Sequence, residues 1–81
     1  MNAQVSSVIQ VVIGAWESAL GLDGLSGDDN FFELGGDSIT AIRLVPLVND
    51  ATGADLDPMA VFDHPTPLDM AEWIVGLQQR T

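Results

Sequence analysis

The residue with the clearest chemical potential in this chain is a serine that follows two glycines and an aspartate. Ser38 lies in the stretch Leu-Gly-Gly-Asp-Ser-Ile, residues 34–39, and further apolar residues come after it. A serine in such a place can be a hydrolase nucleophile, can belong to the cap of a helix, or can be a site where a group is attached. The residues around it discriminate between these roles.

The surroundings of Ser38 do not match those of a nucleophile, which needs a base and donors for the oxyanion. A nucleophile elbow reads Gly-x-Ser-x-Gly on a strand-to-helix turn, whereas residues 36–40 read Gly-Asp-Ser-Ile-Thr and follow no strand pattern. Lipases with a Gly-Asp-Ser-Leu motif also need a sheet and a catalytic histidine. The single histidine, His64, precedes a proline, where it is more typical of a helix end. Independent catalysis is therefore disfavoured.

Acidic residues gather before the serine, but their spacing does not match a calcium loop. They are Asp23, Asp28, Asp29 and Glu33. A calcium loop needs acidic or amide ligands at alternating positions around a central glycine. Counted from Asp23, the third position is Leu25 and the twelfth is Leu34. We therefore predict a solvated acidic face and no metal site.

The helical pattern places the Ser38 hydroxyl at a helix start. A helix is predicted from Asp37 or Ser38 to about residue 51, before Gly53. The N-terminus of a helix offers free N–H donors and the positive end of the dipole, which suits a phosphate. The preceding glycines leave room for an enzyme to approach. The residues are equally compatible with a plain cap, in which Asp37 caps the helix and Ser38 is only its first turn.

The remaining elements are also predicted to be helical. Residues 5–20 carry apolar side chains at steps of three and four, which indicates an amphipathic helix. Asp57-Pro58 resembles an N-cap followed by proline at the first helical position, and it opens a short helix that ends at His64-Pro65. No segment alternates like a strand. The predicted fold class is all-α: a bundle of three main helices and one short helix, as a single domain over residues 1–81.

The last main helix is predicted to start at a capping box. Thr66 caps it, Pro67 forms the first turn, and Asp69 reaches back towards the cap. Four apolar residues follow at helical spacing and are expected in the core: Leu68, Ala71, Ile74 and Leu77.

A long loop, residues 21–37, joins the first two main helices and contains aromatic residues that need burial. A short turn capped by Asp29 is expected within it. Of the adjacent pair Phe31-Phe32, we expect Phe32 to be the deeper, because two neighbours cannot both point inward. The residues predicted to be largely buried, and to tie the loop and the short helix to the bundle, are Trp16, Phe32, Leu34 and Phe62.

Pro46 lies in the middle of the second main helix. Proline has no N–H for the carbonyl of Ile42, and its ring crowds that carbonyl at a cost of about 3 kcal/mol or more. It also disfavours helical geometry at Val45. Because apolar residues surround Pro46, packing can hold the helix together. We predict a bend of more than about 20° and not a termination.

Composition excludes several classes of partner. Nine aspartates and three glutamates against two arginines and no lysine give a net charge of −10. This charge repels nucleic acid and anionic lipid, and it attracts basic surfaces of other proteins. The net charge is explained equally well if the acidic residues only keep the chain soluble. No cysteine, signal peptide or membrane-spanning run is present, which suits a soluble protein of the cytoplasm.

Two segments together resemble a known family. Residues 31–39, Phe-Phe-Glu-Leu-Gly-Gly-Asp-Ser-Ile, are similar to the signature of the peptidyl carrier (thiolation) domains of nonribosomal peptide synthetases. Residues 61–66, Val-Phe-Asp-His-Pro-Thr, resemble the segment between the third and fourth helices of that family. With the helix order, the resemblance covers nearly the whole chain. An interrupted second helix is unusual in the family, and Pro46 is the clearest departure from it.

The resemblance implies a non-catalytic carrier whose Ser38, with Asp37 and Gly36 before it, receives 4′-phosphopantetheine from coenzyme A. A phosphopantetheinyl transferase would attach this group. An adenylation or other loading enzyme would then place an amino, aryl or peptidyl acid on its thiol. Condensation, tailoring or thioesterase domains would take the acid onward. A monomer is expected.

Partner enzymes are expected to dock around the serine. The residues implied by the resemblance are Ile39, Ile42 and Arg43 on the second helix and Met59 and Phe62 on the short one. The alternative is that Ile39 and Ile42 belong to the core. Two other functions remain open: an acyl carrier of polyketide type, disfavoured by Gly36, Ile39 and the two phenylalanines, and a helical adaptor that is never modified.

Overall fold

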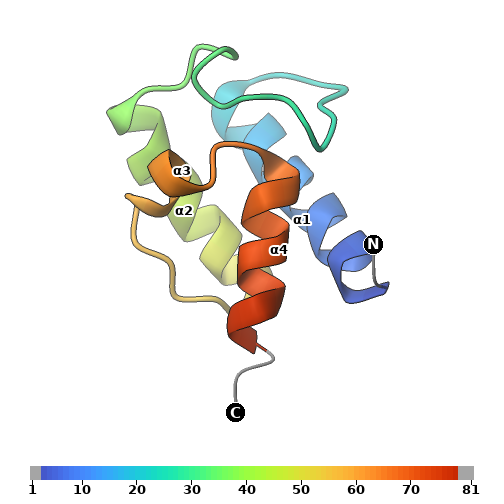
Figure 1. Cartoon of the computed structure of the whole chain (residues 1–81). Helices are drawn as coiled ribbons and strands as arrows, with labels where there is room; N and C mark the ends of the chain where they lie inside the picture. Colours follow the sequence, from blue (N-terminus) through green and yellow to red (C-terminus); the bar gives the residue numbers. More distant parts are fainter. Residues whose placement is uncertain (1–2, 79–81) are drawn as a thin grey trace.

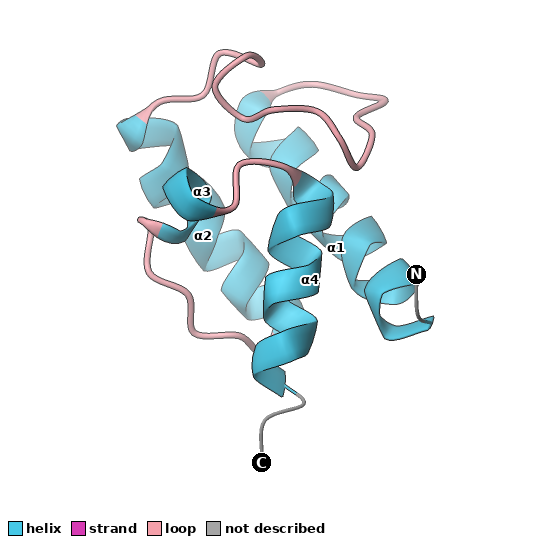
Figure 2. Ribbon diagram, viewed as in Figure 1, coloured by secondary structure: helices cyan, strands magenta, loops and turns pink. Residues whose placement is uncertain are grey.

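The fold is an all-helical bundle, as the sequence predicts. The structure, a computed structural model, describes residues 3–78 and contains α1 (Ala3–Leu20), α2 (Ser38–Thr52), α3 (Ala60–Asp63) and α4 (Pro67–Gln78) (Figure 1). Within this range the remaining residues form loops and turns, and there is no strand (Figure 2). The bundle therefore has three main helices and one short helix.

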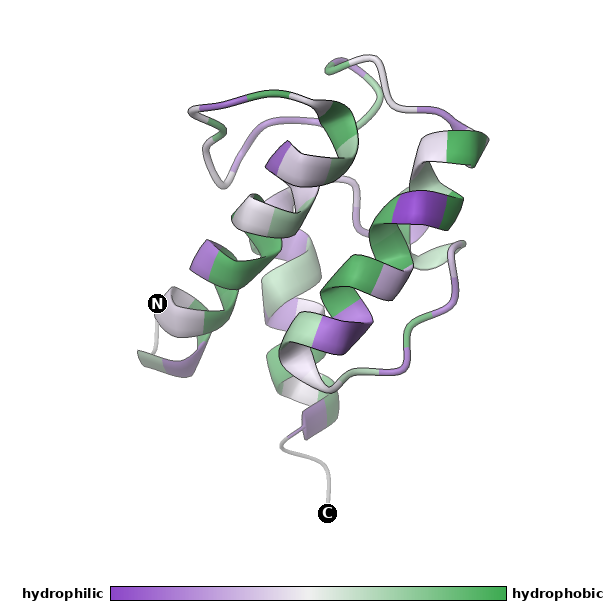
Figure 3. Ribbon diagram, turned by 180° about the vertical axis from the view of Figure 1, so that it is seen from behind, coloured by the Kyte–Doolittle hydropathy of each residue, from purple (hydrophilic) through white to green (hydrophobic). Residues whose placement is uncertain are grey.

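Helix α1 packs against both α2 and α4 and supplies one wall of the core. Its buried residues follow steps of three and four, so that one stripe faces the bundle. In the view from behind, the hydrophilic positions of α1 lie on its outer side (Figure 3). The helix starts two residues before the predicted boundary and ends at the predicted one. The buried residues of α1 are Val5, Ile9, Val12, Trp16 and Ala19.

Helix α2 continues through Pro46 without a break. It ends at Thr52, where Gly53 adopts a left-handed conformation (φ 75°) and donates its N–H to the Asn49 carbonyl at 2.8 Å. Such a residue is a common helix terminator. Pro46 itself is exposed, whereas its neighbours Leu44 and Val45 are fully buried. The expected continuation after the proline is therefore confirmed.

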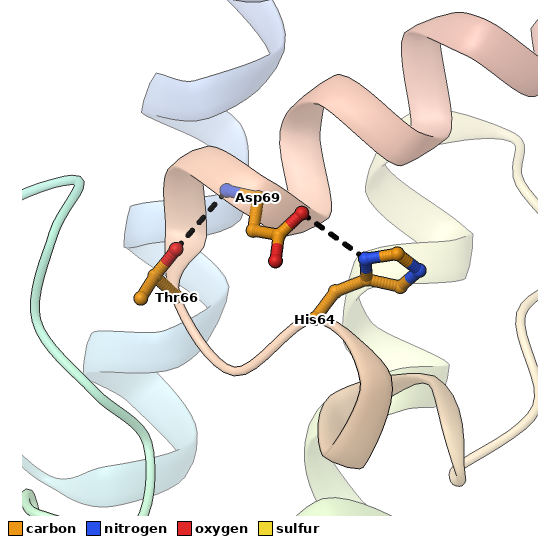
Figure 4. A network of polar contacts seen from close by, with 3 residues as sticks. All are labelled: His64, Thr66 and Asp69. Atoms are coloured by element: carbon orange, nitrogen blue, oxygen red, sulfur yellow. Dashed lines mark hydrogen bonds and ion pairs between the residues drawn. The ribbon is translucent and has the colours of Figure 1, made fainter.

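The start of α4 is capped, but the capping box is incomplete. Thr66 Oγ1 accepts a hydrogen bond from the Asp69 N–H at 3.1 Å, as predicted (Figure 4). The Asp69 carboxylate does not reach back to the cap. It lies 3.1 Å from His64 Nδ1 instead, because the α3–α4 loop brings the imidazole beside the first turn of α4. The contact joins this loop to the helix.

Burial along α4 is partly as predicted. Ala71 and Ile74 are in the core, but Leu68 is only half-buried and Leu77 is exposed. The expectation for Leu77 was wrong because its side of the helix lines an open groove and not the bundle interior. The core residues on α4 are Pro67, Met70, Ala71, Ile74 and Val75.

The two adjacent phenylalanines have the opposite burial from that predicted. Phe31 is 0% exposed, whereas Phe32 is 41% exposed. The reason is the backbone of Phe31, whose N–H donates to the Pro65 carbonyl at 2.8 Å and whose carbonyl accepts from the Gly36 N–H at 2.9 Å. With the backbone held in this way, the Phe31 ring meets Trp16 edge-on, with 5.4 Å between ring centroids. Phe32 consequently points outward.

The other expected anchors of the loop are partly corrected as well. Trp16 is fully buried, as predicted, but Leu34 is only half-buried and Phe62 is exposed. Phe62 packs against Phe32 at the surface, with 5.3 Å between ring centroids, so the two exposed rings cover part of each other. The loop is joined to α3 by an exposed aromatic pair.

The turn within the loop is capped by Asn30 and not by Asp29. Asn30 Oδ1 accepts from the N–H groups of Phe32 and Glu33, at 2.9 and 3.2 Å. The carboxylate of Asp29 turns the other way and accepts from the Ser26 N–H at 2.8 Å. The cap therefore lies one residue after the predicted one, directly before the buried Phe31.

Replacing Phe31 by alanine should destabilise the fold strongly, because truncating a fully buried phenylalanine costs about 3–5 kcal/mol. The matched control is Phe32→Ala, for which a smaller loss of about 1 kcal/mol is expected, since the ring is 41% exposed and its contacts with Phe31 and Phe62 lie at the surface side of the core. Urea unfolding followed by circular dichroism measures both. Equal losses would show that the two rings share the core.

The bend predicted at Pro46 is measured from the axis of α2. Residual dipolar couplings of the backbone amides on either side of the proline give the angle between the two helical halves. We expect more than about 20°, because the Ile42 carbonyl has no N–H partner at position 46. Pro46→Ala should reduce the angle. A straight axis in the unmodified chain would contradict the prediction.

Candidate functional site: the serine at the start of α2

Ser38 is the first residue of α2 and its side chain is exposed. The residue before it, Asp37, has an extended backbone and is the N-cap of the helix. The Asp37 carboxylate accepts from both the N–H and the hydroxyl of Thr40, each at 2.9 Å. The predicted helix start is confirmed, and the cap fixes the first turn so that the Ser38 hydroxyl faces solvent from an ordered position.

The same hydrogen bonds act on the ionisation of Asp37. Donation from the Thr40 backbone, followed by donation from its hydroxyl, lowers the pKa of the Asp37 carboxyl from its ordinary value of 3.8. A carboxyl group whose pKa is lower in the folded state than in the unfolded state stabilises the fold at pH values above its ordinary pKa. This stabilisation is lost as the pH falls through the pKa of the folded state. At neutral pH the cap is therefore ionised and fully formed.

The two glycines before Asp37 have different physical roles. Gly35 has a positive φ of 91°, which residues with a side chain rarely adopt. Gly36 has an ordinary φ, but the Phe31 ring lies against it: a Cβ added at Gly36 would be 2.6 Å from Phe31 Cζ and closer to Cε2. Gly36 is therefore needed so that the buried ring can approach the backbone next to the serine.

A continuous set of contacts thus connects the site to the core. Trp16 on α1 packs on Phe31, Phe31 packs under Gly36, and Gly36 precedes the capped turn that carries Ser38. Sequence reasoning missed the roles of Phe31 and Gly36. The one sequence feature that could have indicated these roles is the pair of glycines. A single left-handed turn position requires only one glycine, so the second glycine suggests a close approach of another group to the backbone.

Several apolar side chains near the serine in sequence are exposed. Ile39 is 70% exposed and Ile42 is 59% exposed, which excludes the alternative that they are core residues. Arg43 on the same helix and Met59 and Phe62 at the short helix are exposed too. The Phe32–Phe62 contact holds α3 to the loop that leads to Ser38.

The residues at this site fit a covalently attached phosphate. The Ser38 hydroxyl forms no hydrogen bond within residues 3–78, so attachment would break no contact there. The first turn of α2 supplies N–H donors that have no acceptor within the helix. In the described part of the chain no group of three or more acidic or histidine side chains could hold a metal ion, and no helix there is long and apolar enough to cross a membrane.

Replacing Gly36 by alanine should destabilise the chain by about 1–3 kcal/mol, because the added methyl group overlaps the Phe31 ring. Gly14→Ala on α1 is the control: an added Cβ there meets nothing within 4 Å, and alanine in a helix should stabilise by about 0.5–1 kcal/mol. Urea unfolding measures both.

A double variant tests the cause of the Gly36 effect. If the Phe31 ring is the obstacle, Gly36→Ala combined with Phe31→Leu should lose less stability than the sum of the two single variants. Strict additivity of the two losses would show that alanine at position 36 acts through something other than the ring.

Comparison with known proteins identifies the class of this chain. The family described as "Phosphopantetheine attachment site" matches residues 10–74. The chain belongs to this family of carrier domains, which are typically non-catalytic and carry a covalently attached 4′-phosphopantetheine.

The relatives found are peptide synthetases. The chain is 41% identical over 68 residues to phosphinothricin tripeptide synthetase PhsB of Streptomyces viridochromogenes, which covers 84% of this chain and 6% of that protein. It is 39% identical over 64 residues to malformin synthetase mlfA of Aspergillus luchuensis, which covers 76% of this chain and 1% of that protein. The chain thus spans only a small part of the length of these relatives.

Solved carrier proteins have the same fold. The type-II acyl carrier protein BlmI from Streptomyces verticillus superposes with a TM-score of 0.87 at 23% identity, covering 93% of this chain and 90% of that one. The A1-type ACP domain from module 5 of MLSA1 superposes with a TM-score of 0.83 at 34% identity, covering 90% and 76%. The four-helix carrier fold predicted from the sequence is therefore confirmed.

Proposed function

We propose that Ser38 is the residue that receives 4′-phosphopantetheine and that the chain acts as a peptidyl carrier in nonribosomal peptide synthesis. The observation that supports this most is the exposed, unbonded hydroxyl at the N-terminus of α2, on a turn fixed by Asp37 and by Phe31 below Gly36. In the reaction, Ser38 Oγ forms a bond to phosphorus and the nucleotide part of coenzyme A leaves. The attached group supplies a thiol that holds acids as thioesters.

Other hydroxyl groups of the chain are less suitable. The Ser26 hydroxyl donates to Asp28, and the Thr40 hydroxyl donates to the Asp37 carboxylate. The Thr52 hydroxyl donates to the Val48 carbonyl. The exposed Ser18 lies in the last turn of α1, where the backbone N–H groups are bonded to the preceding turn and offer nothing to a phosphate.

The peptide pathway is favoured over a polyketide pathway by the relatives, which include peptide synthetases from bacteria and fungi. The proposed loading enzyme is an adenylation domain or a similar acyl-transferring enzyme. The proposed downstream partners are condensation, tailoring and thioesterase domains. We propose that residues 1–81 act as one carrier domain, as a monomer, in the cytoplasm.

Incubation with coenzyme A and a broad-specificity phosphopantetheinyl transferase tests the attachment site. The unmodified chain should gain one phosphopantetheine mass, while Ser38→Ala should gain none and keep its helical circular dichroism. Ser26→Ala is the matched control and should be modified at the wild-type rate. The intact mass of each protein is measured. Modification of the Ser38→Ala variant would contradict the assignment, and a complete lack of modification in the unmodified chain and both variants would favour the adaptor function.

We further propose that partner enzymes contact the exposed residues around Ser38. These are Ile39, Ile42 and Arg43 on α2 and Met59 and Phe62 at α3. All five are exposed, although three are large aliphatic residues and one is aromatic. Exposed apolar side chains that gather near a modification site are typical of a contact surface. Arg43 adds the one arginine or lysine side chain among the described residues.

Ile42→Ala should slow loading by the cognate enzyme about fivefold or more, as expected when a contact residue of an interface is truncated. Leu47→Ala is the matched control, because Leu47 is also exposed on α2 but lies beyond Pro46. Arg43→Glu should likewise change the loading rate and leave the thermal midpoint unaltered. Unchanged kinetics of the Ile42 and Arg43 variants with every loading and downstream enzyme would exclude this surface.

A further inference from the structure

A groove opens between α3, the loop before it and the C-terminal half of α4. Its volume is about 330 Å³, near the lower end of the roughly 300–1,000 Å³ of ligand pockets, which suits one side chain better than a large molecule. The apolar part of its lining includes Leu56, Met59, Trp73 and Leu77. No residue between 31 and 43 contributes to it, so it is distinct from the turn that carries Ser38.

The aromatic wall of the groove is held in place. The Trp73 indole remains 39% exposed, while the His64 imidazole stacks on it with 4.8 Å between ring centroids and 20° between planes. Asp69 fixes the imidazole through its contact with Nδ1 at 3.1 Å (Figure 4). A ring that is held by a neighbouring side chain and still partly exposed can contact a ligand at little entropic cost.

The charged part of the lining is entirely acidic apart from His64. Asp55, Asp57 and Asp63 all border the groove. Asp57 accepts from the Met59 N–H at 2.8 Å, whereas within residues 3–78 the carboxylates of Asp55 and Asp63 form no hydrogen bond or ion pair. Arg43, the one arginine of that range, does not line the groove. The carboxylates therefore lack a cationic partner there.

We propose that this groove binds an arginine side chain of a partner protein. Aspartates beside an apolar floor are complementary to a cation on an apolar stem. A planar guanidinium can stack on Trp73 and form paired hydrogen bonds with a carboxylate at the same time, which the compact ammonium of lysine cannot do. A metal ion is not the fitting occupant, because among the described residues no group of three acidic or histidine side chains is placed to bind one.

The probe for this site is the peptide acetyl-Ala-Arg-Ala-amide, with lysine and citrulline peptides of the same length as comparators. NMR titration at low ionic strength follows the indole N–H signal of Trp73, with buried Trp16 as internal reference. We expect saturable binding of the arginine peptide in the millimolar range, weaker binding of lysine, and none of citrulline. Arg80 lies outside the described residues, and the titration is therefore run on the Arg80→Gln variant. In this variant Arg43 is the one arginine of the chain that could compete with the peptide for the groove.

Matched variants separate the groove from the general acidity of the chain. Asp55→Asn and Asp63→Asn should each weaken binding about two- to fivefold, the range expected for exposed ion pairs. Asp23→Asn and Glu33→Gln remove the same charge from the loop between α1 and α2 and should change the affinity much less. The chain is used without phosphopantetheine, so the result is independent of whether Ser38 is modified.

Three results would overturn the proposal. The arginine and citrulline peptides could move the Trp73 signal equally, which would indicate an apolar occupant. The loop variants could weaken binding as much as the groove variants, which would indicate unspecific attraction. Finally, sedimentation of the free chain could show a dimer that Arg43→Gln abolishes, which would make a second copy the occupant.

Discussion

The contact between the Phe31 ring and the Gly36 backbone is the constraint on which the rest of the site depends. It places a fully buried aromatic ring directly below the turn that carries the serine. Burying a side chain of this size is worth roughly 1.5–3 kcal/mol, a substantial part of the stability of so small a domain. The turn before α2 is therefore ordered by the core itself, although the loop around it is long and rich in glycine.

This constraint also determines what is exposed. Because Phe31 takes the place in the core, Phe32 is left at the surface, where it pairs with Phe62 and holds α3 to the loop. Ile39 and Ile42 are on the outer side of α2, while Ala41 and Leu44 face the core. In the proposed function the chain presents one hydroxyl and an apolar surface to several enzymes in turn, and a turn fixed on a packed core provides both with little reorganisation.

Helix positions and the place of Ser38 followed from local signals, because capping residues, glycines and apolar spacing act within a few residues. Local signals do not predict which of Phe31 and Phe32 is buried, because this is determined by a hydrogen bond from the Phe31 N–H to the distant Pro65 carbonyl. Asn30 and Asp29 are both good caps, and only the tertiary position of the turn selects Asn30. The exposure of Leu77 depends on a groove whose other wall comes from the loop before α3.

We propose that Ser38 carries phosphopantetheine on a turn anchored by Phe31. One NMR sample of the phosphopantetheine-loaded chain tests both parts. Phosphorus–carbon coupling should appear at Ser38 Cβ, and nuclear Overhauser effects should connect the Phe31 ring to the Gly36 α-protons. Coupling at any other serine would rule out Ser38 as the attachment residue, and contacts from the Phe32 ring to Gly36 in place of those from Phe31 would show that Phe31 does not anchor the turn.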